Sequence, residues 1–167
     1  MSNRNSKVKI LAIAALLAAI ICSATTSFHI PVGVNGGYVH VGDAFIYMAA
    51  SILPLPYAMM VAAIGAGLAD LLSGAAVWVI PTIIIKPILV LFFTSKNEKI
   101  LCKRNVLAVL LAGFTGVMLY CLAEYIMYGN FIAAFYMNFI TLVQPVGSGV
   151  VSVSYTHLRA HETRSNL

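Results

Sequence analysis

One stretch of the chain decides its fold: it opens with GGYVHVGDAF (Gly36–Phe45), continues through an apolar run to GAGLADLLSG (Gly65–Gly74), and ends with WVIPTIIIKP (Trp78–Pro87). The first two segments each place an acid at one end of an apolar run, and the third holds a lone lysine. An ionisable group is costly to bury in a membrane, so it marks a functional site by default. We therefore predict that this stretch lines a pocket for a small polar molecule.

The composition of the chain excludes a soluble domain. Hydrophobic residues make up 61% of the 167 residues and charged residues only 9%, whereas a soluble domain carries about 25% charged residues. Several apolar runs approach the length of about 20 residues that spans a bilayer as a helix. These features predict an all-α integral membrane protein, built as a six-helix bundle whose helices are short and kinked.

The basic residues set the predicted topology. Arg4, Lys7 and Lys9 precede the first helix without an acid, which places the N-terminus in the cytoplasm. The next basic segment, Ser95–Arg104, falls on the same side after four spans, so the net charge of +5 reflects topology rather than nucleic-acid binding. Pro87 lies inside the fourth helix and should kink it. The predicted helices cover residues 8–26, 43–53, 57–72, 77–93, 106–128 and 135–152, within one membrane domain that covers residues 1–152.

Polar side chains from separate segments fall on the outer side of this topology, whereas the cytoplasmic halves of the helices hold almost none. Several segments that contribute polar groups at one depth indicate a binding site more strongly than any single residue does. Aromatic residues among them offer a face on which a planar ring can stack. The candidate substrate-binding residues are Tyr38, His40, Asp43, Asp70, Trp78, Lys86, Glu124, Asn138 and Gln144.

Structural roles are the alternatives for the same residues. Asp43 stands where it can cap the N-terminus of a helix and favour its positive dipole end. Lys86 lies too deep to reach water easily, so an ion pair with Asp70 or Glu124 is the alternative to direct substrate contact. Trp78 is also placed as an interfacial anchor.

No motif in the sequence indicates an enzyme. The chain lacks an H-E-x-x-H zinc motif, a phosphate-cradling P-loop, a Cys/His metal spacing and a G-x-S-x-G elbow. We therefore expect no catalytic residue, no bound metal and no nucleotide-driven motor in this chain. Three functions stay open on these grounds: a solute-binding subunit, a stand-alone secondary transporter or facilitator coupled through its buried charges, and a structural membrane subunit.

Small residues in the first helix predict a helix-packing surface. Ala14 and Ala18 lie four residues apart, as do Ala15 and Ala19. Such spacing makes a smooth stripe that another helix can approach closely. Contact with a partner subunit and ordinary packing within the chain are both open.

The composition changes abruptly at Val153–Leu167, where the sequence reads VSYTHLRAHETRSNL. Charged residues and histidines appear here although the sixth helix should still be crossing the membrane. The first part of this tail resembles the translated read-through of a sequencing adapter. We therefore expect residues 153–167 to be non-native and the sixth helix to be truncated.

Three elements together carry a resemblance to a known family: GGYVHVGDAFIYMAASILP, GAGLADLLSG and PTIIIKP. Over Lys7–Val151 the chain resembles the substrate-binding S components of energy-coupling factor (ECF) vitamin transporters, in the branch of riboflavin- and pyrimidine-type S components. The resemblance implies high-affinity binding of a water-soluble vitamin or precursor on the extracellular side of a prokaryotic cell membrane. Riboflavin, a pyrimidine and a pyridoxine-like compound all remain open as the substrate.

The resemblance also implies the partners. An S component pairs with a membrane-embedded T component and two cytoplasmic ATPase subunits, so ATP is used by the partners and no cofactor is expected in this chain. The alanine stripe of the first helix would contact the T component. In this family the sixth helix normally continues and contributes to the pocket wall.

Overall fold

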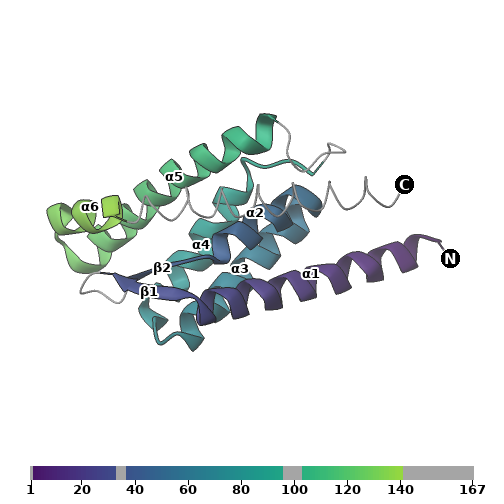
Figure 1. The fold of residues 1–167 in the computed structure, drawn as a ribbon, viewed down its shortest axis with the longest axis horizontal. Coiled ribbons are helices and arrows are strands. Elements are labelled where there is room, and N and C mark those ends of the chain that lie inside the picture. The colour runs from purple at the N-terminus through teal and green to yellow at the C-terminus, as the bar shows by residue number, and fades with distance from the viewer. Residues whose placement is uncertain (1, 33–36, 96–102, 141–167) are drawn as a thin grey trace, which may run out of the picture.

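The computed structural model of the protein describes residues 2–32, 37–95 and 103–140. Within these ranges it contains six helices, one 3-10 turn and a two-stranded hairpin (Figure 1). The prediction of a six-helix membrane fold is confirmed. The elements in chain order are α1 (Ser2–Ser27), β1 (His29–Val32), β2 (Gly37–His40), α2 (Gly42–Ile52), α3 (Leu55–Leu72), η1 (Ala76–Trp78), α4 (Val79–Val90), α5 (Lys103–Tyr128) and α6 (Phe131–Ile140).

The helices differ in how much of a bilayer they can cross. Three segments in the described part of the chain are long and apolar enough to span it: Lys7–Ser27, Leu55–Leu72 and Arg104–Tyr128. By contrast, α2 has 11 residues and α4 has 12, which gives lengths of about 16 and 18 Å at 1.5 Å per residue. The hydrocarbon core is about 30 Å thick, so the expectation of short helices holds for these two elements.

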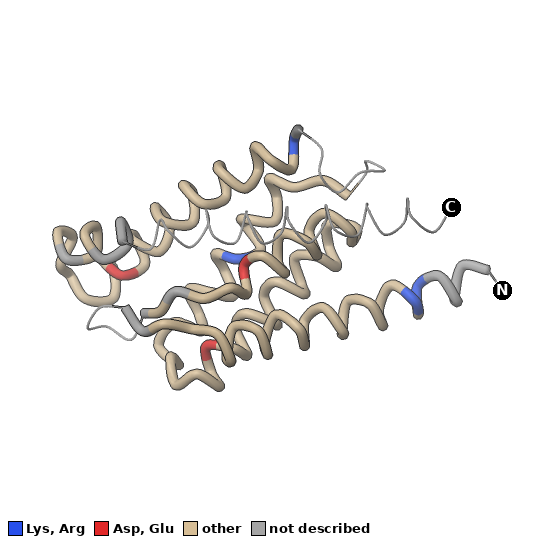
Figure 2. Tube along the Cα trace, in the orientation of Figure 1, with Lys and Arg blue, Asp and Glu red and all other residues tan. Residues whose placement is uncertain are grey.

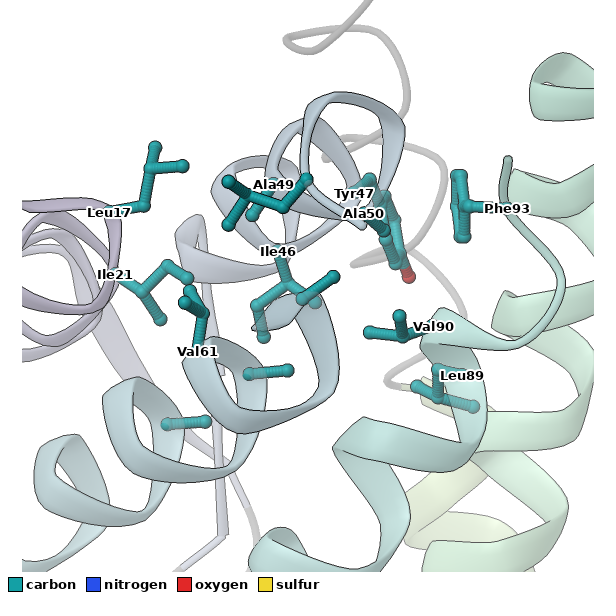
Figure 3. Packing of buried hydrophobic residues seen from close by; sticks show 14 of the residues in the cluster. Leu17, Ile21, Ile46, Tyr47, Ala49, Ala50, Val61, Leu89, Val90 and Phe93 are labelled. Carbon is teal, nitrogen blue, oxygen red and sulfur yellow. The ribbon is translucent and has the colours of Figure 1, made fainter. Parts of the chain in front are cut away.

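Helix α2 is the most enclosed element of the bundle. Eight of its 11 residues are buried, because helices α1, α3 and α4 all pack against it. Ile46 of α2 points into the core toward Val61 of α3 (Figure 3). Ile21 of α1 and Val90 of α4 lie on either side of this contact. A helix surrounded in this way keeps its position only if its polar groups find partners inside the protein.

The segment between α1 and α2 contains two short strands that were not predicted from the sequence. They form the antiparallel hairpin β1–β2, in which His29 pairs with His40 and Pro31 with Tyr38. The strands are only four residues long and one contains a proline, so they lack the long alternating pattern that identifies strands in a sequence. A two-stranded hairpin is only marginally stable on its own, so this hairpin depends on its contacts with the neighbouring helices.

Helix boundaries also differ from the sequence-based ones: α1, for example, begins at Ser2 rather than at residue 8. The helix predicted over residues 77–93 begins with the tighter turn η1 and continues as α4 to Val90, with Pro87 inside it. Helix α6 begins at Phe131 rather than at residue 135. Its predicted continuation to residue 152 and the tail Val153–Leu167 lie outside the described residues.

We predict that Gly42→Ala destabilises the fold. A Cβ added at Gly42 would lie 1.8 Å from Thr25 Oγ1 and 2.9 Å from His40 Nδ1, and Thr25 is only 1% exposed. Overpacking of this kind typically lowers the free energy of unfolding by about 1–3 kcal/mol. Thermal unfolding in detergent micelles measures the loss.

Gly116→Ala is the matched control, because a Cβ there meets Leu89 at an ordinary 3.4 Å and alanine favours the helix. This control should be neutral or stabilising. Adding Thr25→Ala to Gly42→Ala should recover part of the loss, since it removes the hydroxyl in the way. If Gly42→Ala unfolds at the wild-type temperature, α1 and α2 are not in the close contact described here.

Candidate solute-binding site

An ion pair between α2 and α4 lies at the centre of the polar residues. Lys86 Nζ is 2.6 Å from Asp43 Oδ1, and the two residues are 3% and 4% exposed. Asp43 stands in the first turn of α2, where a carboxylate also favours the positive end of the helix dipole. The lysine pairs with Asp43 rather than with Asp70 or Glu124, the two partners considered from the sequence.

One face of α4 converges on a single tyrosine of α5. Thr82 Oγ1 and Tyr120 Oη are 3.0 Å apart and share a hydrogen bond. Lys86 Nζ lies 5.4 Å from the centre of the Tyr120 ring, in the geometry of a cation–π contact. The rings of Trp78 and Tyr120 are 6.0 Å apart at an angle of 52°. Because Trp78, Thr82 and Lys86 are spaced by four residues, they share one helix face.

A second polar contact joins the hairpin to α3. The Tyr38 hydroxyl of β2 donates a hydrogen bond to Asp70 Oδ1 in the last turn of α3. Burial raises the pKa of the Tyr38 hydroxyl, and the neighbouring Asp70 carboxylate raises it further. The second carboxylate oxygen, Asp70 Oδ2, is buried and has no hydrogen-bond partner among the described residues. A buried acceptor without a partner is unfavourable, so Asp70 can accept a further donor.

The hairpin places two histidines around Tyr38. The Tyr38 ring lies 5.2 Å from the ring of His29 and 5.4 Å from that of His40. His40 Nδ1 accepts a hydrogen bond from the Gly42 backbone N–H at the start of α2, so this nitrogen must be unprotonated. Burial lowers the pKa of His40 from 6.5 to about 4. The imidazole therefore joins the hairpin to α2 as a neutral group.

Five of the predicted site residues take part in the ion pair, in the hydrogen bond between Tyr38 and Asp70, or in the histidine contacts of the hairpin. Trp78 is buried beside Tyr120, and Glu124 is buried in α5. Asn138 belongs to α6, and Gln144 lies outside the described residues. The residues brought together are Tyr38, His40, Asp43, Asp70 and Lys86.

Sequence reasoning missed Thr82 and Tyr120. Both residues carry a hydroxyl group inside an apolar helix, and a single hydroxyl group there is not by itself a sign of a binding site. The signal was the spacing: Thr82 stands four residues from both Trp78 and Lys86, and Tyr120 stands four residues before Glu124. Residues with this spacing lie on one helix face.

The two alanine pairs of α1 have different surroundings. Ala14 is 9% exposed and belongs to the core, and a side chain at Gly65 of α3 would come within 2.9 Å of the Ala18 carbonyl oxygen. Ala15 and Ala19 are exposed. The first pair therefore packs within the chain, and only the second offers a surface for another helix.

Charge is distributed unevenly along the bundle. The basic positions at the starts of α1 and α5 lie at one end, and the acidic positions lie in the other half, one of them beside a lysine (Figure 2). Lys7, Lys9 and Arg104 are exposed, whereas Asp43, Asp70 and Glu124 are all buried. The bundle is therefore polarised, with a solvated basic end opposite an end that encloses polar groups.

Long apolar helices that enclose polar side chains at one end of the bundle define a multi-pass membrane protein. A family model described as the ECF-type riboflavin transporter, S component, matches residues 5–158. The chain belongs to this family, whose members are substrate-binding subunits of vitamin transporters and not enzymes. No curated protein and no solved structure matches the chain.

We predict that removing one charge of the buried pair is costly. Lys86→Met leaves the Asp43 carboxylate buried without its cation, and breaking a buried pair in this way typically costs about 3–5 kcal/mol. The double variant Lys86→Met/Asp43→Asn removes both charges and should recover most of that loss. Unfolding in detergent gives the stability of the wild-type protein, of Lys86→Met and of the double variant. A double variant no more stable than Lys86→Met would contradict the pairing.

We also predict that His40 makes stability depend on pH. Its pKa is about 4 in the folded protein against 6.5 for an ordinary histidine, so the unfolded chain binds the proton first as the pH falls. The stability contributed by neutral His40 is complete above pH 6.5 and is lost as the pH falls toward about 4. Thermal unfolding across this range should show a decline that His40→Gln reduces. Equal declines in both proteins would show that His40 does not carry the effect.

Proposed function

We propose that this chain binds riboflavin, or a closely related flavin, at the polar end of the bundle and delivers it to an ATP-driven importer. The family to which the chain belongs is described as the S component of ECF-type riboflavin transporters. The observation that carries the proposal is the set of buried polar atoms around Lys86 and Asp70 that still have capacity to bond. A purely structural subunit gains nothing from such groups, because each of them is costly in an apolar bundle.

The donors and acceptors of the site match those of a flavin. An ammonium group has three N–H donors, and among the described residues Lys86 uses one hydrogen-bond acceptor, Asp43 Oδ1. The remaining donors suit the carbonyl oxygens of a flavin ring. Asp70 Oδ2 is a free acceptor, which suits either the ring N–H or a hydroxyl of the ribityl chain.

Aromatic side chains beside these groups suit a planar ligand. Trp78 and Tyr120 lie close to one another next to Lys86, and their rings offer apolar faces with a polar edge. Tyr38 closes the site from the hairpin through its hydrogen bond to Asp70. We infer that the ligand enters beneath the hairpin and exchanges this hydrogen bond for its own.

The polarised bundle supports an orientation and a partner surface. Basic residues accumulate on the cytoplasmic side of membrane proteins, so we place Lys7, Lys9 and Arg104 in the cytoplasm of a prokaryotic cell and the ligand site outside. The exposed Ala15 and Ala19 then offer the smooth surface that a membrane-embedded T component can approach. Two cytoplasmic ATPase subunits would use the ATP, and this chain would need no cofactor of its own.

We predict that the full chain, purified in detergent, quenches the fluorescence of riboflavin on binding it. Asp70→Asn should weaken binding at least about tenfold, which corresponds to about 1.4 kcal/mol, because the amide replaces an acceptor with a donor. Titration of riboflavin fluorescence against protein concentration gives the dissociation constant. Tyr38→Phe, which keeps the ring and removes the hydroxyl, should change the affinity less than Asp70→Asn does.

Lys9→Gln is the control, since it removes an exposed charge at the opposite end of the bundle and should leave binding unchanged. A folded protein that binds no flavin would refute the proposed ligand, and a pyrimidine or a pyridoxine-like compound would be tested next. Uptake in vesicles separates the importer from a stand-alone secondary transporter. The importer requires the T component and ATP, whereas a secondary transporter requires neither.

A further inference from the structure

Asn105, in the first turn of α5, forms a complete hydrogen-bonded clamp at the basic end of the bundle. It is 4% exposed. Its Oδ1 accepts from the Thr94 backbone N–H at 2.9 Å, and its Nδ2 donates to the Thr94 carbonyl oxygen at 3.0 Å. The same Nδ2 donates to Ser51 Oγ of α2 at 3.1 Å. One side chain thus joins the residues after α4 to the last turn of α2.

Helix α2 carries three contacts on one face, spaced by four residues. Asp43 pairs with Lys86 at the outer end, and Ser51 bonds to Asn105 at the inner end. Between them, the Tyr47 ring stacks on Phe93 at 5.0 Å with an angle of 19° between the ring planes. This face therefore contacts α4, the residues just after α4, and α5 in successive turns.

The position of α2 is fixed at its two ends by polar bonds and along its length by burial. Ser51 Oγ also bonds the Tyr47 carbonyl oxygen at 2.8 Å, so its hydroxyl is oriented toward Asn105. From residue 43 to residue 51 the helix rises about 12 Å. Most of the helix is buried, so we expect a displacement of one end to shift the other.

We infer that Asn105 is a positioning residue, which acts through Ser51 and α2 to hold Asp43 against Lys86. Neither Asn105 nor Ser51 touches the ligand site. Loosening their bond nevertheless frees the inner end of α2, so the ion pair at the outer end becomes less ordered. The ligand-binding consequence rests on the proposed function, but the positioning itself does not.

The test uses Ser51→Ala in the full chain, because this substitution cuts the bond to α2 and leaves both bonds between Asn105 and Thr94. Hydrogen exchange of the backbone amides in the outer turn of α2, Asp43–Ile46, should speed up by about tenfold. Riboflavin affinity should fall by about fivefold or more, the usual lower range of coupling between separated sites.

Ala112→Gly is the matched control. It weakens α5 at a buried position by loss of helix propensity without removing a bond to α2. It should lower thermal stability but leave exchange at Asp43–Ile46 and riboflavin affinity unchanged. Asn105→Leu should reproduce both effects of Ser51→Ala.

A double-variant cycle shows whether Ser51 acts through Asp43. If it does, Ser51→Ala has no further effect on riboflavin affinity once Asp43→Asn is present. Unchanged exchange at Asp43–Ile46 in Ser51→Ala would overturn the inference, as would additive losses of affinity in the cycle. If the wild-type chain binds no flavin, the proposed function fails, and the exchange measurement still decides the positioning role.

Discussion

Polar groups enclosed by apolar helices must find their partners within the protein, and this constraint shapes the whole bundle. Water is excluded from the core, so an unsatisfied charge or hydroxyl there is costly. Lys86 therefore meets Asp43, Thr82 meets Tyr120, and Asn105 uses its amide on Thr94 and Ser51. These contacts join α2, α4 and α5 more specifically than apolar packing alone can, because each has a direction and a length.

The same constraint identifies the candidate site. Most buried polar atoms of the described residues are satisfied, and the exceptions are few: Thr25 Oγ1, Asp70 Oδ2 and Ser73 Oγ. Two of these three lie at the outer end of α3, where Tyr38 of the hairpin also reaches. Among these exceptions only Asp70 is an ionisable group, which is why we propose that the ligand binds beside it.

The sequence predicted the general architecture because composition and helix length follow from the solvent. The long apolar runs, the basic ends and the proline inside α4 are all local features that can be read residue by residue. The partner of Lys86 could not be read in this way, because Asp43 is 43 positions away and three acids were available. The hairpin escaped prediction for a different reason: its strands are stabilised by Tyr38 contacting α3, and short strands carry little pattern of their own.

The neutrality of the Lys86–Asp43 pair has an electrical consequence. When a single charge crosses a membrane, its electrical energy changes by about 2.3 kcal/mol for every 100 mV of membrane potential. Lys86 alone would thus couple its own displacement across a membrane to the voltage across that membrane. Because Asp43 lies 2.6 Å from Lys86 Nζ, the pair carries no net charge, and translating the pair together through a uniform field requires no electrical work. The voltage can then neither drive nor resist that movement through these two residues.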